Sequence, residues 1–390
     1  MDLDALGQSP IGQLVPISGT DATTGRHYDY FAFLPDPLPR TLELASATWT
    51  QVAAAEAALG RLDQAAQQVP EPSLLRRPAL RQEAQSTSAL EGTFAPFEVV
   101  LDSEPEDRHG LTVEVREVLN YVVAAEHGFS WVRERPITVG LIERLQKTLV
   151  SDTPSQHRDA GRIREQQVII GARGTPIESS RYVPPPQGDQ LRAGMETWLD
   201  WFRNHPGDLP PVARAALAHY QFEALHPFSD GNGRIGRLLI AMQLIQDDVL
   251  REPILVVSPW FEARRTEYQD GLLELSRTGD WDAWVSFFAA GIEASADLTR
   301  ATVDALFAWR ARALQITKNA NVSALCERIA GELIGTPIVR APQIAKRHGV
   351  TPQGAMLALR KLVSLGLLTE GRTRGRVRFV AGDVLEVLGQ

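Results

Sequence analysis

The chain has 390 residues, of which 44% are hydrophobic and 23% charged, a balance typical of a folded globular protein. That length predicts about two or three domains. Its single cysteine, Cys326, excludes an intrachain disulfide and a cysteine-based zinc site, and it favours a reducing compartment. The chain starts with acidic residues, and its longest aliphatic stretch, 238–245, is far shorter than the ~20 residues of a membrane span. We therefore expect a cytoplasmic protein with no membrane contact.

The net charge of −8 is unevenly distributed along the chain. Residues 340–390 carry 9 Lys and Arg against 3 Asp and Glu, a balance of +6, which leaves −14 for residues 1–339. A basic tail on an acidic body favours contact with a polyanion or an acidic partner, although short basic segments are also common on solvated surfaces.

The spacing of apolar residues predicts a mainly α-helical body. Residues 1–40 are rich in Gly, Pro, Thr and Asp without a sustained period, so we expect an extended arm there. Apolar residues then recur every three or four positions, which is typical of amphipathic helices around a shared core. The segments with this pattern are 48–68, 80–90, 113–127, 137–149, 191–204, 212–225, 237–248, 264–276 and 282–312.

One segment interrupts the helical pattern. Residues 167–171 are rich in β-branched side chains, and the chain returns through Arg181 to Val183 after a turn at 174–176. We expect this segment to form a β-hairpin flap.

The last 70 residues follow a different pattern. Three short helices are expected at 324–333, 341–348 and 352–365, with Thr351 as the N-cap of the third. Two strands, 367–369 and 377–380, then flank a basic turn. This order predicts a winged helix-turn-helix, whose wing would offer Arg372, Arg374 and Arg376 to the phosphates of DNA. The predicted divisions are an arm at 1–40, a helical region at 41–110, a catalytic core with following helices at 111–318 and the winged helix at 319–390.

The segment HPFSDGNGRIGR at 226–237 carries the strongest chemical signal. It contains the spacing G-x-G-x-x-G, but a helical pattern precedes it and no βαβ unit surrounds it, so a dinucleotide fold is excluded. A glycine-rich loop that enters a helix still directs unpaired backbone N–H groups at one point, and the helix dipole adds positive potential. With Arg234 and Arg237 on the first turns, the segment predicts a site for several phosphate oxygens.

A base and an acid accompany this anion site. His226 has an ordinary pKa of ~6.5 and can accept a proton from an attacking hydroxyl near neutral pH. Asp230 offers hard oxygen ligands suited to Mg²⁺ between phosphates. Taken singly, each residue has an ordinary structural explanation, a helix end for His226 and a solvent turn for Asp230; the twelve residues together favour a functional site.

This segment resembles the signature of the Fic family, His-Pro-Phe-x-(Asp/Glu)-Gly-Asn-Gly-Arg-x-x-Arg, at every defined position. The flap segment and the stretch 258–281, with Tyr268, are also similar to the family, and the resemblance covers roughly residues 40–300. The family fold is a helical core, and its members transfer AMP from ATP to a protein hydroxyl. The resemblance therefore implies a protein adenylyltransferase that uses ATP and Mg²⁺.

The resemblance also implies a role for each residue of the site. His226 would be the general base that activates a Ser, Thr or Tyr of the target protein, and Asp230 would hold Mg²⁺. Arg237 would grip the γ-phosphate, and Tyr268 belongs to the expected nucleotide pocket. The remaining phosphate contacts would come from Gly231, Asn232, Gly233 and Arg234. Gly233 stands where related Doc-type kinases carry Lys, which favours nucleotidyl transfer.

An upstream segment resembles the inhibitory motif of the family, (Ser/Thr)-x-x-x-Glu-(Gly/Asn). Thr87, Glu91 and Gly92 match its defined positions, with Gly92 as the expected C-cap of a helix. The motif implies that Glu91 pairs with Arg237 in a two-pronged salt bridge and so restrains ATP binding.

Three alternatives stay open from the sequence. The same site could hydrolyse AMP from a modified protein, with Glu91 aligning a water. The winged helix could be the output of a transcription regulator whose nucleotide site is a sensor. A metal hydrolase could use His219, Glu223 and His226, which share one helix face, although it leaves the loop after them unexplained. The resemblance also leaves open whether the protein modifies itself, forms a homodimer, or uses the winged helix for DNA or protein contacts.

Overall fold

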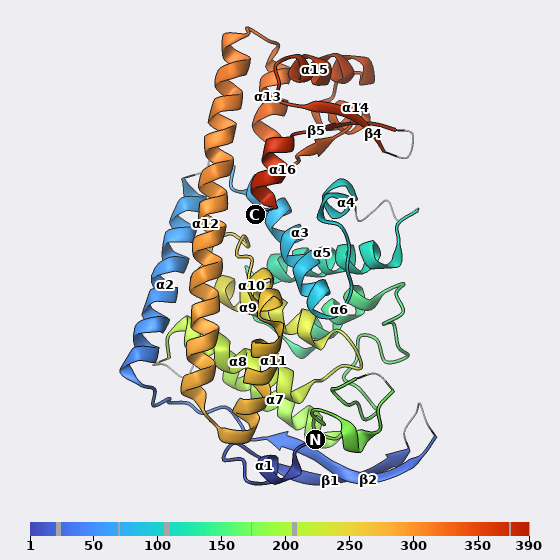
Figure 1. The fold of residues 1–390 in the computed structure, drawn as a ribbon, viewed down its shortest axis with the longest axis vertical. Coiled ribbons are helices and arrows are strands. Elements are labelled where there is room, and N and C mark those ends of the chain that lie inside the picture. Colours follow the sequence, from blue (N-terminus) through green and yellow to red (C-terminus); the bar gives the residue numbers. More distant parts are fainter. Residues whose placement is uncertain are drawn as a thin grey trace.

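A computed structural model describes residues 1–20, 25–68, 71–104, 110–172, 174–204, 209–373 and 376–389. The described chain is mainly α-helical, as the apolar spacing predicts (Figure 1). A helical body lies between a small N-terminal hairpin at one end and a compact C-terminal domain at the other. No helix in the described ranges has the length and apolar character needed to cross a bilayer.

The N-terminal segment differs from the extended arm that we expected. It forms α1 (Leu3–Gly7) and an antiparallel hairpin of β1 (Gly12–Thr20) and β2 (His27–Pro35). The hairpin is tied to the flap, since the backbone N–H of Phe33 donates to the carbonyl of Val183 at 2.9 Å. The composition did not predict these strands. In β2, the alternation of exposed and more buried side chains is confined to one short aromatic segment, HYDYFAFLP.

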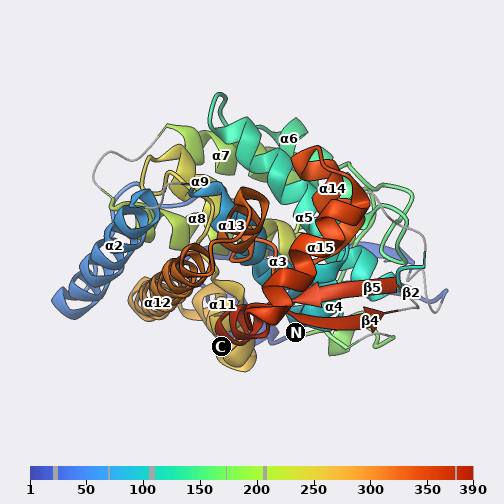
Figure 2. The same ribbon diagram turned by 90° about the horizontal axis from the view of Figure 1, so that it is seen from above.

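The helical body contains eleven helices among the described residues, α2 to α12. The helices α2 and α12 lie side by side along the length of the molecule, while α8 and α9 lie antiparallel at the centre (Figures 1 and 2). In chain order the helices are α2 (Ser46–Gln67), α3 (Ser73–Leu90), α4 (Phe97–Asp102), α5 (Val113–Val132), α6 (Val139–Val150), α7 (Asp189–Arg203), α8 (Pro211–Leu225), α9 (Asn232–Gln246), α10 (Ser258–Ala263) and α11 (Arg265–Thr278), followed by the long α12 (Trp281–Asn319) that leads to the C-terminal domain. The centre of this body is where the signature segment falls.

The flap is less regular than the predicted β-hairpin. Its two arms meet at a single antiparallel bridge between Ile170 and Tyr182, with a 3-10 turn at Ile177–Ser179 between them. Prolines at 184–186 lack the backbone N–H groups that a ladder needs. The pairing of the two arms therefore does not extend beyond this bridge on the returning side.

The C-terminal domain has the helices and strands that we expected and two further elements. The helices are α13 (Ala324–Glu332), α14 (Ala341–His348) and α15 (Pro352–Ser364), and the wing strands are β4 (Thr369–Thr373) and β5 (Arg376–Val380). Thr351 caps α15, since its hydroxyl accepts the N–H of Gly354 at 3.1 Å. The additional β3 (Ile338–Val339) completes an antiparallel sheet of order β3-β5-β4, and α16 (Gly382–Leu388) packs on α12. Arg374, a predicted wing residue, lies outside the described residues.

Candidate functional site

The segment 226–231 is a tight loop between α8 and α9. His226 ends α8 in the left-handed region, with φ 47° and ψ 60°, and Gly231 precedes α9 with φ 87°. The side chain of Asn232 closes the loop, because its Oδ1 accepts the N–H of Phe228 at 2.8 Å and its Nδ2 donates to the carbonyl of Phe228 at 2.7 Å. Arg164 adds a hydrogen bond of 2.9 Å to the carbonyl of His226. The loop backbone is therefore held by the side chains of Asn232 and Arg164.

The first turn of α9 concentrates positive charge. Arg234 and Arg237 are each only 2% exposed. Arg234 donates to the Asp230 carboxylate at 2.7 Å, and its Nη1 forms a longer ion pair of 3.8 Å with Glu117, while its buried Nε and Nη1 make no hydrogen bond in the described structure. Buried guanidinium donors without an acceptor, next to a helix N-terminus, are the chemistry of an anion site.

A cavity of about 490 Å³ opens beside this turn. The segments that line it come from α3, the flap, α8, α9 and α11. Among the predicted site residues, His226, Gly233, Arg237, Tyr268 and Glu91 line it, whereas Asp230, Gly231, Asn232 and Arg234 lie in the adjoining loop and turn. The structure thus brings the predicted base, the arginine of the last signature position and the inhibitory carboxylate to one space.

The environment of His226 favours a neutral imidazole. Burial, assisted by the positive charge of Arg164, lowers the pKa of His226 to about 4. Its Nδ1 lies 3.3 Å from the carbonyl oxygen of Glu223. Because a carbonyl only accepts hydrogen bonds, this contact places the ring proton on Nδ1 and leaves Nε2 with a free lone pair. That is the state a general base requires.

Glu223 and His219, which the sequence suggested only as metal ligands, have other surroundings. Burial raises the pKa of the Glu223 carboxyl to about 8, and its buried Oε1 has no hydrogen-bond partner in the described structure. His219 Nε2 lies 2.7 Å from the hydroxyl of Tyr268, and burial lowers the pKa of His219 to about 3. Glu223 lines the cavity and is thus a site residue that sequence reasoning did not assign to this pocket; its position three residues before His226 was the available signal.

The inhibitory motif forms the end of α3. Its C-terminus is a Schellman motif, in which the N–H of Thr93 bonds the carbonyl of Ser88 and the N–H of Gly92 bonds that of Ala89, each at 2.9 Å. Gly92 has a φ of 90°, which suits glycine. This turn fixes the direction in which Glu91 leaves the helix.

Glu91 and Thr87 together hold Arg237. One carboxylate oxygen of Glu91 lies 2.5 Å from Arg237 Nη2, so the bridge is single and not the two-pronged bridge that we expected. Thr87 explains the difference, because its hydroxyl accepts from Arg237 Nε at 2.7 Å and its carbonyl accepts from Nη2 at 3.1 Å. Burial alone would raise the pKa of Glu91, but the charge of Arg237 outweighs it and the pKa is lowered. Glu91 is therefore ionised at neutral pH.

The Glu91 carboxylate also covers the N-terminus of α9. A methyl group placed on Gly233 would fall on the Glu91 oxygen and lie 3.0 Å from a nitrogen of Arg237. An anion bound at this turn would need the same space and the same guanidinium.

Asp230 is the predicted magnesium ligand. Among the described residues, no three His, Cys, Asp or Glu side chains gather into a metal site. Magnesium in nucleotide sites takes one or two carboxylates and otherwise phosphate oxygens and waters, so a single carboxylate is a sufficient protein ligand. The Asp230 side chain is 26% exposed, and one of its oxygens accepts a hydrogen bond from Arg234. This partly exposed carboxylate fits the role of a magnesium ligand.

Comparison with known proteins agrees with this site. Residues 49–130 match the family described as Fic/DOC family N-terminal, and residues 136–244 match the Fic/DOC family. The second match contains most of the loop and helix that build the site. The chain therefore contains a segment that matches the Fic N-terminal family and a segment that matches the Fic domain, and the second includes residues 226–237 of the candidate site.

Curated relatives from fruit flies carry the name protein adenylyltransferase Fic. The Drosophila melanogaster protein is 28% identical over 269 residues, which is 68% of this chain and 46% of the relative, and the Drosophila willistoni protein is 30% identical over 227 residues, 58% and 38% respectively. The chain therefore spans less than half the length of these relatives. A Fic family protein from Desulfovibrio desulfuricans G20 shares the fold, with a TM-score of 0.55 at 20% identity over 87% of this chain and 97% of that one.

Proposed function

We propose that this protein transfers AMP from ATP to a hydroxyl of a protein substrate and that Glu91 restrains the transfer. The observation that carries the proposal is the neutral His226, with its Nε2 lone pair free, beside a helix N-terminus rich in arginine. The name of the fruit-fly relatives supports the same activity. Because the chain spans less than half of these relatives, its activity and its substrates are both part of this proposal.

In the proposed reaction, the substrate hydroxyl oxygen attacks the α-phosphorus of ATP. His226 Nε2 takes the hydroxyl proton, the bond between the α-phosphorus and the bridging oxygen breaks, and pyrophosphate leaves. Nδ1 keeps its hydrogen bond to the Glu223 carbonyl, which holds the ring in the orientation that presents Nε2 to the cavity. The chain's contribution is mostly positioning and charge, as is usual for transfer at phosphorus.

The α9 turn would bind the triphosphate. Backbone N–H groups at Gly231 to Gly233 and the Arg234 donors that make no hydrogen bond in the described structure can donate to phosphate oxygens, and Arg237 can clamp the terminal phosphate. Asp230 would hold Mg²⁺, which would supply positive charge to the phosphates. Tyr268 forms one wall of the cavity and is held by His219.

The restraint follows from competition for Arg237. While Glu91 and Thr87 occupy the guanidinium, a terminal phosphate lacks its partner and meets an ionised carboxylate next to Gly233. An uncompensated negative charge in such a site is unfavourable. We expect ATP to bind the restrained form in a non-productive geometry.

The test uses the full chain, ATP labelled at the α-phosphate and Mg²⁺ in a cell lysate. The proposal predicts that proteins gain label and that His226→Ala, at equal concentration, labels nothing above background. The gel also shows whether the protein labels itself. Equal labelling by both proteins would remove His226 from the mechanism, and no labelling by the Glu91→Gly protein would contradict the activity.

A further inference from the structure

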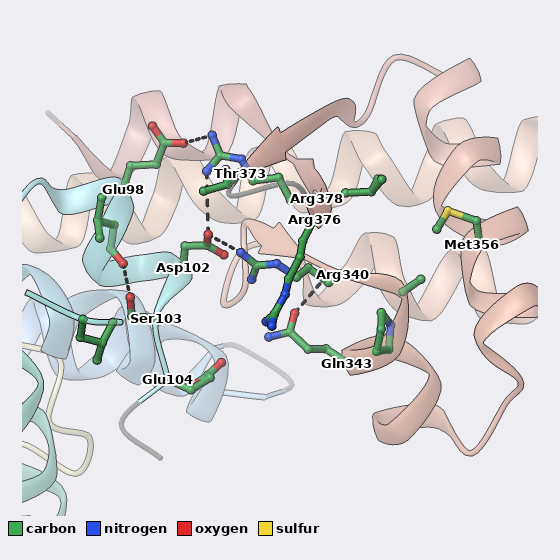
Figure 3. A pocket seen from close by; sticks show the side chains of 15 residues that line it. Glu98, Asp102, Ser103, Glu104, Arg340, Gln343, Met356, Thr373, Arg376 and Arg378 are labelled. Atoms are coloured by element: carbon green, nitrogen blue, oxygen red, sulfur yellow. Dashed lines mark hydrogen bonds and ion pairs between the residues drawn. The ribbon is translucent and has the colours of Figure 1, made fainter. Parts of the chain in front are cut away.

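A second, larger cavity lies between α4 and the C-terminal domain (Figure 3). It has a volume of about 960 Å³. One wall comes from α4 and the residues after it and carries Glu98 and Asp102. The other wall comes from the C-terminal domain and carries Arg340, Arg376 and Arg378. The cavity is thus an interface between an acidic helix and a basic domain.

The basic wall contains the parts that a winged helix-turn-helix presents to a duplex. They are the first turn of α14, which includes Pro342 and Gln343, Met356 on α15, and Thr373 and Arg376 on the wing strands. In such domains the second helix of the pair faces the major groove, and helix N-termini and nearby cations contact phosphates. Part of the face that would meet DNA, formed by these residues, therefore lines the cavity opposite α4.

The acids of α4 pair with this face. Asp102 lies 2.5 Å from Arg340 and 3.9 Å from Arg378, and Glu98 lies 2.6 Å from Arg378 (Figure 3). Asp102 is 11% exposed and Arg340 is 21% exposed, so this pair is better shielded from water than a surface ion pair. The carboxylates of α4 thus pair with the arginines that the phosphates of a duplex would contact.

From this juxtaposition we infer that the C-terminal domain binds duplex DNA through Arg340, Arg376 and Arg378 and that α4 masks this surface by competing for the same arginines. The inference is independent of the proposed AMP transfer. Charge favours a nucleic acid as partner, since residues 340–390 carry a balance of +6. Arg376 is exposed at the cavity and has no ion pair among the described residues. Its guanidinium is therefore available to bind a phosphate before α4 is displaced.

The helix α4 is anchored to the helical body and therefore does not move with the C-terminal domain. Arg81 of α3, only 3% exposed, donates to the carbonyl of Val100 at 3.0 Å and to that of Ser103 at 2.8 Å. These bonds hold the C-terminal half of the α4 backbone, where Asp102 lies. For a duplex to reach Arg340 and Arg378, the C-terminal domain has to separate from α4, so DNA binding and α4 docking exclude each other.

The first test measures the affinity of the full chain for a fluorescein-labelled DNA duplex of about 20 base pairs by anisotropy, at fixed salt. Glu98→Gln combined with Asp102→Asn is expected to tighten binding roughly tenfold, because the competing carboxylates are lost. The matched control is Glu252→Gln, which removes a carboxylate of the helical body that pairs with Arg76 and Arg133 and does not line this cavity. We expect the control to change affinity less than about twofold. The exposed Glu98→Gln alone, which leaves the fold least disturbed, should tighten binding about threefold.

The second test is hydrogen exchange of 97–102 with and without saturating duplex. Exchange in α4 should rise when DNA binds, and Arg376→Gln should weaken binding without changing exchange in the free protein. Equal affinity of the unmasked variant and the control, no binding by either, or unchanged α4 exchange in the DNA complex would each overturn the inference. A duplex RNA bound as tightly as DNA would overturn the choice of partner.

Discussion

His226 shows how much of the chemistry depends on one backbone position. A non-glycine residue at φ 47° is strained by roughly 1–3 kcal/mol, and it persists because neighbouring bonds determine the loop. The Asn232 amide and Arg164 supply those bonds. The position turns Nδ1 back to the carbonyl of Glu223 and leaves Nε2 for the cavity.

The pKa of His226 gives a prediction for pH dependence. Because burial lowers this pKa to about 4, the imidazole is neutral and active as a base from about pH 5 upward. We expect the rate of AMP transfer by Glu91→Gly protein to be flat between about pH 5 and 7 and to fall as pH drops through about 4. Transfer is measured within the range where circular dichroism shows the fold intact. An acid limb centred near the ordinary value of ~6.5 would contradict the assignment.

Asp230 gives a prediction for metal dependence. Asp230→Asn keeps the size of the side chain but removes its charge, so transfer should fall by about 10²-fold and the Mg²⁺ concentration for half-maximal rate should rise. The measurement is a Mg²⁺ titration of transfer, with Asp159→Asn as a control carboxylate that binds Ser229 in the same loop. Full transfer by the wild-type protein in EDTA would contradict a metal role.

At the residue scale, the sequence predicts the signature because its twelve residues are contiguous and their chemistry is local. It does not predict that Thr87 takes two donors of Arg237, or that Glu223 lines the cavity with a raised pKa. Both facts depend on how α3 and α8 pack against α9, which no local pattern encodes.

The element that governs the proposed restraint is α3. Its Schellman end aims Glu91 at Arg237, 146 residues away in sequence. Replacing Glu91 with Gly should raise AMP transfer by about tenfold or more, because the competing carboxylate is removed. Adding Arg237→Ala should cancel that gain, since the clamp for the terminal phosphate is then missing, so the two changes are non-additive.

The rates of the two single variants and the double variant decide this point. Activation that persists without Arg237, or no activation by Glu91→Gly, would rule out the lock. Gln85→Ala is a suitable control on the same helix, because Gln85 bonds the carbonyl of Ala95 and not the site.

The elements that the sequence misjudges share a physical reason. The strands β1 and β2 are stabilised by pairing with each other and by contact with the flap, whereas the composition of this region resembles a loop. The flap was expected as a hairpin, but its β-branched arm finds only one bridge because the return arm runs into prolines. Strand pairing is a long-range property, while the helices follow from a local period, and so the helices were predicted more fully.

The larger of two hydrophobic clusters among the described residues includes residues from Leu6 near the N-terminus to Leu388 near the C-terminus, while a small second cluster of Ala32, Ile177 and Val183 lies between the hairpin and the flap. Trp309 on α12 is 4% exposed and belongs to the larger cluster, and its Nε1 lies 3.4 Å from Asp383 on α16. Trp309→Ala should therefore lower the free energy of unfolding by about 3–5 kcal/mol. Leu298→Ala, on the same helix but 50% exposed, should change it by less than about 0.5 kcal/mol. Urea denaturation measures both, and equal effects would contradict the role of Trp309.

The central claim, that this site transfers AMP, is tested most directly by the fate of each phosphate of ATP. Purified Glu91→Gly protein is incubated with the protein substrate found in the lysate, in parallel with ATP labelled at the α- and at the γ-phosphate. Transfer of AMP predicts that the substrate gains the α-label and none of the γ-label, with pyrophosphate released in equal amount and no label after His226→Ala. Incorporation of the γ-label, or of neither, would contradict the account.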